Sequence, residues 1–177
     1  MPFSFVLLVR RTERKFIAMT QKEKILLEQD FEAYSNTVLR IAVQNTKNYH
    51  DAEDIVQEVF IRLAKNGENA FLDESHKKAW IIRVTINICR DLNRFTAFRK
   101  FQPLEEYPYI SDDGGMERCE LLELIRKLPE AKRNAVYLFY YEGMTIEEIA
   151  EATGKSPGTV GSDLHRARKM LRIELED

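Results

Sequence analysis

The sequence is poor in cysteine and histidine, the side chains on which most metal centres and many catalytic sites depend. Its two cysteines, Cys89 and Cys119, lie far apart and belong to no CxxC motif. The three histidines, His50, His76 and His165, are scattered, and no pairing of a nucleophile with a base is apparent. This pattern argues against a zinc site, a disulfide framework and an enzyme, and it predicts no cofactor. It also suits a reducing cytoplasm, which is the expected location.

Long hydrophobic runs are missing too. No stretch approaches the roughly twenty apolar residues that span a bilayer, so no membrane insertion is predicted. The apolar run 3–9 is short and its charges follow it, so residues 1–18 resemble a signal peptide only faintly. The first helix is expected to begin at Thr20, because Thr20 and Glu23 have the spacing of a capping box. We therefore expect residues 1–19 to be an extension outside the fold.

Positive and negative charges nearly balance over the whole chain, but positive charge is concentrated in one segment. The formal net charge is −2. Between residues 77 and 100, however, seven lysines and arginines face one acid, Asp91, which gives that segment a charge of +6. Any nucleic-acid-binding surface must therefore come from such local clustering.

Apolar residues recur at helical spacing and predict an all-α fold. We expect one helix from Thr20 to about Lys47, one from Asp51 to Asn66, and one from about His76 to Phe95. The residues expected to face the core are Leu27, Phe31, Tyr34, Val38 and Ile41 in the first helix, Ile55, Val59 and Leu63 in the second, and Trp80, Val84, Ile88 and Leu92 in the third.

A linker divides the chain into two small helical domains. Residues 96–115 have no sustained periodicity and contain two prolines and a Gly-Gly pair. The N-terminal domain is predicted over 20–95 and the C-terminal one over 116–177. The latter should contain four helices, with the first two over 117–127 and 129–142.

The C-terminal domain is expected to end in a helix-turn-helix. Thr145 and Glu148 form a second capping box, Gly154 provides a tight turn, and Ser156 with Pro157 restarts a helix. In that last helix Val160, Leu164, Ala167 and Leu171 make one apolar stripe, and Thr159, Ser162, Arg166 and Lys169 lie opposite. This arrangement is typical of a DNA-reading motif, although a helical hairpin of another kind of domain is the alternative.

Each of two polar faces of the N-terminal domain could be a binding surface or an ordinary solvated surface. The second helix is acidic at its start. These acids could bind a partner, or they could simply be solvated at the N-terminus of a helix, where negative charge is favourable. The third helix carries a stripe of Arg83, Asn87, Arg90 and Arg94 close to the lone aromatic Phe71. Charge, amide and ring together suit nucleic acid, whereas the alternative is a solvated face with Phe71 in the core.

Taken together, these segments resemble a known family. DAEDIVQEVFIRLAK (51–65), AWIIRVTINICRDLNR (79–94), and EGMTIEEIA, SPGTV and RAR in the C-terminal domain are similar to bacterial RNA polymerase sigma factors of the extracytoplasmic-function (ECF) group. The resemblance implies binding to core RNA polymerase, recognition of the minus-ten and minus-thirty-five promoter elements, DNA melting and transcription initiation. It also implies an anti-sigma factor as a partner. The alternative is a stand-alone, dimeric helix-turn-helix regulator.

The resemblance assigns roles to individual residues. Those that would face the clamp helices of the largest polymerase subunit are Asp51, Asp54, Gln57 and Glu58. Those that would contact the melted minus-ten element are Asn69, Phe71, Ser75, Trp80, Arg83, Asn87, Arg90 and Arg94, with an extruded base between Phe71 and Asn87. Those that would contact the minus-thirty-five duplex are Ser156, Thr159, Ser162, His165, Arg166, Arg168 and Lys169.

The last helix departs from the family pattern at two positions. Gly161 stands where a basic or polar residue is common, and Asp163 follows it. Fewer phosphate contacts should make this domain a weak DNA binder on its own. Alternatively, Gly161 permits close packing against a neighbouring element.

Overall fold

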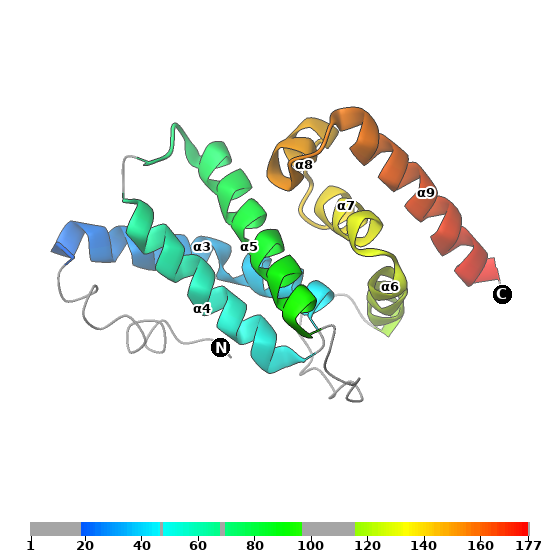
Figure 1. Ribbon diagram of the computed structural model, residues 1–177, viewed down its shortest axis with the longest axis horizontal. Coiled ribbons are helices and arrows are strands. Elements are labelled where there is room, and N and C mark those ends of the chain that lie inside the picture. The colour runs from blue at the N-terminus through cyan, green and yellow to red at the C-terminus, as the bar shows by residue number, and fades with distance from the viewer. Residues whose placement is uncertain (1–18, 47, 68–69, 97–115, 177) are drawn as a thin grey trace. The chain divides into compact units, whose positions relative to one another are not determined.

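The computed structural model describes residues 19–46, 48–67, 70–96 and 116–176 (Figure 1). Within these ranges every regular element is a helix, which confirms the all-α prediction. The helices are α3 (Gln21–Asn45), α4 (Tyr49–Asn66), α5 (Glu74–Thr96), α6 (Met116–Lys127), α7 (Glu130–Tyr140), α8 (Ile146–Thr153) and α9 (Pro157–Glu176). Chain contacts separate α3–α5 from α6–α9 as two compact units. The expected extension and linker lie outside the described residues, apart from Met19 and Thr96 at their edges.

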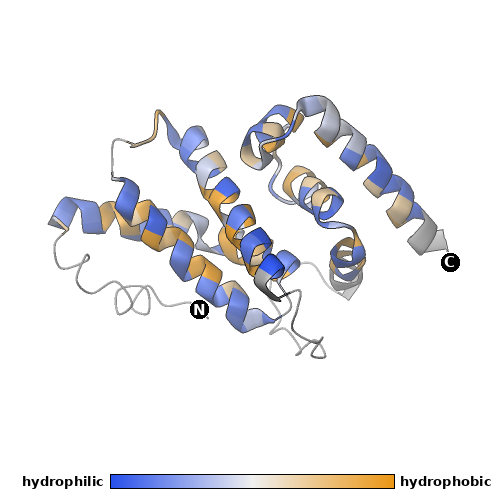
Figure 2. Cartoon of the chain, viewed as in Figure 1, coloured by the Kyte–Doolittle hydropathy of each residue, from blue (hydrophilic) through white to orange (hydrophobic). Residues whose placement is uncertain are grey.

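The N-terminal unit is a three-helix core in which each helix packs against the other two. All the residues expected to face the core from α3 and α4 are buried, and Val56 and Phe60 join them. The rings of Phe31 and Phe60 meet with centroids 4.8 Å apart and tie α3 to α4. Figure 2 shows apolar and polar residues alternating along each helix, as amphipathic helices require.

Two helix starts differ from expectation. Helix α4 begins at Tyr49, because the side chain of Asn48, rather than that of Asp51, caps it by accepting the Asp51 N–H at 2.7 Å. Helix α5 begins at Glu74, because Asp73 Oδ1 accepts the His76 N–H at 2.7 Å. Ser75 therefore lies in the first turn of α5 and not in the preceding loop. Gly67, with φ of +82°, ends α4 as expected.

The prediction for the buried face of α5 was wrong. Trp80, Val84, Ile88 and Leu92 are only partly buried, and the core face consists of Ala79, Ile81, Ile82, Thr85, Ile86 and Cys89. At about 100° per residue, Asp91 projects between Trp80 and Val84, so burying the predicted face would have desolvated a carboxylate. None of these six residues is charged, and Lys78, which the same geometry places among them, is only partly buried. The one hydroxyl of this face, on Thr85, donates to the carbonyl oxygen of Ile81 at 2.8 Å.

The C-terminal unit consists of α6–α9, and its last two helices form the expected helix-turn-helix. Both hydrogen bonds of the Thr145–Glu148 capping box are present, and Gly154 adopts the left-handed conformation with φ of +67°. Ser156 Oγ accepts the Thr159 N–H at 3.2 Å, so it caps α9. Val160, Leu164 and Ala167 are buried. Helix α7 ends at Tyr140, two residues before its predicted end.

Asp163 fastens the turn to α9. Its carboxylate pairs with Lys155 Nζ at 2.8 Å, and both side chains are largely covered. The aspartate that departs from the family pattern therefore faces a lysine of its own unit. In the described part of the chain, no helix is long and apolar enough to cross a membrane.

Gly161 offers a direct test of helix stability. An added Cβ would meet no atom within 4 Å, so the suggestion that this glycine permits close packing was wrong. Gly161→Ala should stabilise the C-terminal unit by about 0.5–1 kcal/mol, because alanine loses less backbone entropy in a helix. Native-state hydrogen exchange of α9 amides in the full chain would measure this change.

Gly154→Ala is the matched control. Alanine is strained at a φ of +67°, so this variant should lose about 1 kcal/mol. Lower protection of α9 in Gly161→Ala would contradict the argument.

Candidate functional site

The polar stripe of α5 is assembled as the sequence predicts. Arg83, Asn87 and Arg94 are exposed and Arg90 is partly so. The Arg90 guanidinium donates to Asn87 Oδ1 at 3.5 Å, and Arg94 lies 3.9 Å from Asp91. Guanidinium groups suit phosphates, and an amide can pair with a base edge. The stripe therefore has the chemistry for nucleic acid.

The loop before α5 is held against that helix by aromatic contacts. The Phe71 ring meets Trp80 edge-on with centroids 5.4 Å apart, and His76 with centroids 5.9 Å apart. The Leu72 N–H also reaches His76 Nδ1 at 3.4 Å. These contacts lie at the start of α5, whereas Asn87 lies two turns farther along, about 10 Å beyond Trp80. Asn69 lies outside the described residues, and Ser75 is exposed.

A polar cluster fastens the start of α5 to α3. Lys77 Nζ contacts Asp30 at 2.7 Å and Glu74 at 3.2 Å, and the Tyr34 hydroxyl donates to Glu74 Oε1. This hydrogen bond holds the pKa of Glu74 below its ordinary value. Burial, followed by the bond to Glu74, raises the pKa of Tyr34, so the pair remains phenol and carboxylate at neutral pH.

Sequence reasoning missed this cluster. The residues it joins across α3 and α5 are forty or more positions apart. Tyr34 was predicted as an ordinary core residue, and the three charged members look like ordinary surface residues of amphipathic helices. Behind the loop, Phe71, Leu27, Leu63 and Lys77 help to line a cavity of about 80 Å³. The loop therefore contacts α5 and faces α3 and α4 across this cavity.

The acidic start of α4 borders a groove. Asp51, Asp54 and Glu58 line one side, and the apolar residues of the groove are Ile55, Ile61, Ile88 and Leu92. Its volume is about 230 Å³. Gln57 is partly exposed on α4 but does not line the groove. The spacing of Ile88 and Leu92 predicts that both face the core, whereas in the structure both line this groove.

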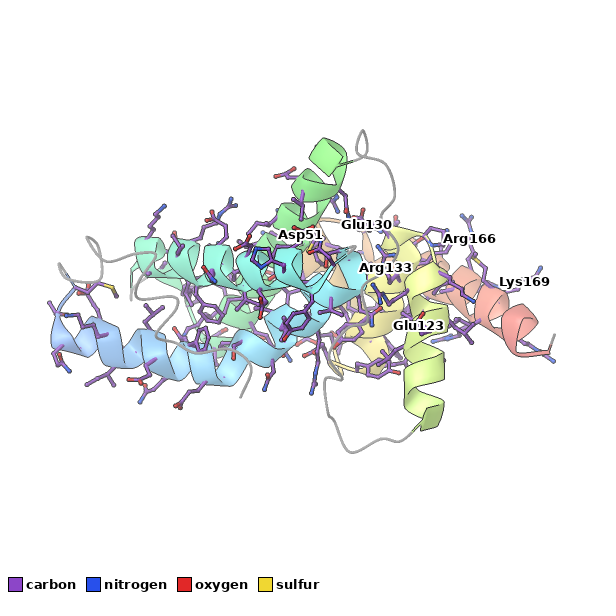
Figure 3. The ribbon with its side chains drawn as sticks, turned by 90° about the horizontal axis from the view of Figure 1, so that it is seen from below. Asp51, Glu123, Glu130, Arg133, Arg166 and Lys169 are labelled. Atoms are coloured by element: carbon purple, nitrogen blue, oxygen red, sulfur yellow. The ribbon has the colours of Figure 1, made fainter. Side chains whose placement is uncertain are left out.

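The exposed side of α9 carries most of the predicted duplex-reading residues. Ser156, Thr159, Ser162, His165, Arg166 and Lys169 are all exposed, and Figure 3 shows Arg166 and Lys169 along this helix. Ser156 Oγ and Thr159 Oγ1 share a hydrogen bond of 2.8 Å. At 3.6 residues per turn, Thr159, Ser162, Arg166 and Lys169 share one face.

Arg168 is placed differently from the other basic residues. Its Nε donates to the Tyr140 hydroxyl at 2.8 Å, and its guanidinium lies 5.9 Å from the centroid of the Phe139 ring and 5.8 Å from that of Tyr140. These distances are typical of cation–π contacts. Arg168 thus joins α9 to α7, on the side of the helix away from Arg166.

Comparison with known proteins gives matches in both units. Residues 31–99 match the family model for sigma-70 region 2, and residues 120–171 match that for sigma-70, region 4. The chain is 32% identical over 149 residues to the ECF RNA polymerase sigma factor SigE of Mycolicibacterium smegmatis. The aligned region covers 78% of this chain and 57% of that protein. It is 34% identical over 155 residues to the RNA polymerase sigma-E factor of Streptomyces avermitilis, covering 83% of this chain and 86% of that protein.

The fold has a solved counterpart. The sigma factor RpoE of Bartonella quintana, crystallised with the anti-sigma factor NepR, superposes with a TM-score of 0.70 at 21% identity, over 84% of this chain and 96% of that one. The two family models together span most of the chain, and the relatives match across both units. The chain therefore belongs to the ECF group of RNA polymerase sigma factors, which direct promoter recognition.

Proposed function

We propose that the N-terminal unit docks on core RNA polymerase through α4 while α5 contacts the melted minus-ten element, and that α9 reads the minus-thirty-five duplex. The observation that carries this proposal is the separation of charge on one small unit. An acidic groove lies between α4 and α5, and a basic stripe follows another side of α5. Each surface therefore suits a partner of opposite charge. We assign the protein no catalytic chemistry and place it in the cytoplasm.

The groove suits a helix of the polymerase clamp that carries apolar side chains beside lysines or arginines. Apolar residues of both α4 and α5 would contact the apolar side chains, and Asp51, Asp54 and Glu58 would attract the basic ones. DNA phosphates would be repelled from the same surface. The acidic groove thus favours protein, and the stripe favours nucleic acid.

The C-terminal unit should bind duplex DNA weakly by itself. Among the basic residues exposed on α9, Arg166 and Lys169 share the face of Thr159 and Ser162, Arg172 lies about one turn beyond Lys169, and Arg168 contacts α7. Lys155 pairs with Asp163. Few phosphate contacts give low affinity at physiological salt. Tethering to a docked N-terminal unit would raise the effective concentration of α9 at the promoter.

An anti-sigma factor that covers these surfaces is a further part of the proposal. One solved structure of similar fold, that of the sigma factor RpoE, contains the anti-sigma factor NepR, and another contains CnrH with the cytosolic domain of CnrY. A stand-alone dimeric regulator would need a dimer interface and a tightly binding reading helix. The modest charge of the α9 face does not favour that function.

In vitro transcription from a genomic fragment library would test the proposed function. Bacterial core polymerase should initiate at specific sites only when this protein is added, and aligned start sites should reveal two upstream elements. Absence of new start sites, together with tight salt-sensitive duplex binding by the protein alone, would favour the stand-alone regulator.

The groove generates a prediction about polymerase binding. Asp54→Lys and Leu92→Gln should each weaken binding of core polymerase about tenfold, because one reverses a charge of the groove and the other removes apolar contact. Titration of labelled protein with core polymerase would measure this effect. Ile25→Gln is the matched control, since Ile25 is 47% exposed on α3 and does not line the groove. Equal losses in all three variants would contradict a specific role for the groove.

Two arginines of α9, Arg166 and Arg168, should separate recognition from stability. Arg166→Ala should reduce initiation at promoters that need the minus-thirty-five element by about fivefold to tenfold, with unchanged unfolding, because its side chain is exposed on the reading face. Arg168→Ala should cost roughly 1 kcal/mol of stability, because it loses the contacts to Phe139 and Tyr140. Start-site assays and urea unfolding would measure the two effects. Wild-type stability of Arg168→Ala would show that the contact with α7 contributes little.

A further inference from the structure

Buried polar side chains gather at the C-terminal end of α3. Gln44, Asn45 and Thr46 are consecutive, and each is more than nine-tenths buried. The last turn of α3, which is described throughout, contains no basic residue, so no cation is available there for its carbonyl groups. The carbonyl oxygens at this end of the helix therefore need other hydrogen-bond donors.

Side chains supply these donors, and one of them comes from α5. Asn45 Nδ2 donates to the Ile41 carbonyl oxygen at 2.8 Å, and the Thr46 hydroxyl donates to that of Ala42 at 2.9 Å. The carbonyl oxygen of Asn45 accepts from Asn93 Nδ2 at 2.9 Å, from a residue 48 positions along the chain. Asn93 thus joins the end of α5 to the end of α3.

The corner between α3 and α4 continues from this contact to the acidic side of the groove. The Thr46 hydroxyl also reaches the carbonyl oxygen of Asn48 at 3.2 Å. Asn48 accepts the Asp51 N–H at 2.7 Å and donates to Asp51 Oδ2 at 2.9 Å. Asp51, labelled in Figure 3, lines the groove from α4, and Leu92, the neighbour of Asn93, lines it from α5. The contact made by Asn93 therefore links the two sides of the groove.

Core packing does not hold this end of α5. Among the described side chains of α5, Cys89 is the last that is buried, and Leu92 and Asn93 are only partly buried. Asn93 does not line the groove, and neither do the exposed Asp91 and Arg94, which lie 3.9 Å from each other. Any influence of Asn93 on a partner in the groove must therefore act through the position of α5.

We propose that Asn93 is a positioning residue for polymerase docking, whose hydrogen bond to Asn45 fixes the spacing between the end of α5 and the start of α4. This inference rests on the proposed function of the groove. Without the bond, Leu92 can move relative to Asp51. A docking partner must then restore their spacing, and this ordering lowers its affinity.

Titration of labelled protein with core polymerase tests this role. Asn93→Ala and Asn93→Asp should each weaken binding about fivefold, because neither side chain can donate to the Asn45 carbonyl oxygen. Asn93→Gln keeps an amide donor and should retain most of the affinity.

Asn93→Asp gives the sharpest comparison. A negative charge added near an acidic groove would by itself strengthen the binding of a basic partner, whereas loss of the donor should weaken it. Unchanged or tighter binding by Asn93→Asp would overturn the proposal, as would wild-type affinity in Asn93→Ala.

Tyr34→Phe is the matched control that separates positioning from stability. It removes the hydrogen bond between Tyr34 and Glu74, which fastens the other end of α5 to α3, and neither residue lines the groove. Urea unfolding should show similar losses of stability in Tyr34→Phe and Asn93→Ala, whereas only Asn93→Ala should lose polymerase affinity. Equal losses of affinity would show that affinity follows stability alone and would overturn the proposal.

A double-mutant cycle across the groove tests the route of the effect. If Asn93 acts on the spacing between Leu92 and Asp51, Asn93→Ala should cause a smaller loss of affinity in an Asp51→Asn background than in the wild type. Losses that multiply would overturn this route. Absence of polymerase binding by the wild type, or unchanged affinity in Asp54→Lys, would instead overturn the proposed function of the groove.

Discussion

The packing of α5 on α3 and α4 is the constraint on which the rest of the N-terminal unit depends. Burial of Ile82, Ile86 and Cys89 fixes the rotation of α5 about its axis, and this rotation decides what every other side chain of the helix can do. It turns Arg83 and Asn87 outward as part of the basic stripe. It also brings Ile88 and Leu92 to the groove beside α4. If α5 were rotated about its axis by about 100° so that Arg83 faced α3 and α4, the guanidinium of Arg83 would be buried. The basic stripe would then no longer be exposed.

Features with a local cause could be predicted from the sequence, and those set by distant partners could not. The capping box at Thr145, the left-handed Gly154 and the restart at Ser156 each depend on residues a few positions apart, so the helix-turn-helix was predicted correctly. The rotation of α5 was predicted wrongly, because that helix has two apolar stripes and periodicity alone does not distinguish them. The local signal that does distinguish them is Asp91, which lies within the predicted stripe. The Tyr34–Glu74 and Lys77–Asp30 contacts leave no pattern in the sequence at all. The expected roles of individual site residues in binding remain predictions.

The basic residues of α9 show why charge counted along a sequence overestimates a DNA-binding surface. Arg168 lies between Ala167 and Lys169 in the sequence, yet its guanidinium rests on Phe139 and Tyr140 of α7. Lys155 is directed to Asp163 in the same way. A charge that has a partner within the unit must give up that partner before it can contact a phosphate, so its contribution to DNA affinity is reduced.

A near-neutral protein can still orient two partners of opposite charge if its own charges are segregated. In the N-terminal unit the acids gather at the start of α4 and the arginines along α5, and both surfaces include residues of the same rigid helix. A partner that is attracted to the acidic groove is thus repelled by the basic stripe, and the reverse holds for a partner of opposite charge. This suppresses binding of either partner to the wrong surface. Because α5 contributes Ile88 and Leu92 to the groove and Arg83 and Asn87 to the stripe, the spacing between the two contacts is set by the helix itself. Under the proposed function, the core packing of Ile82 and Ile86 would therefore set the position of a bound DNA strand relative to a docked protein partner.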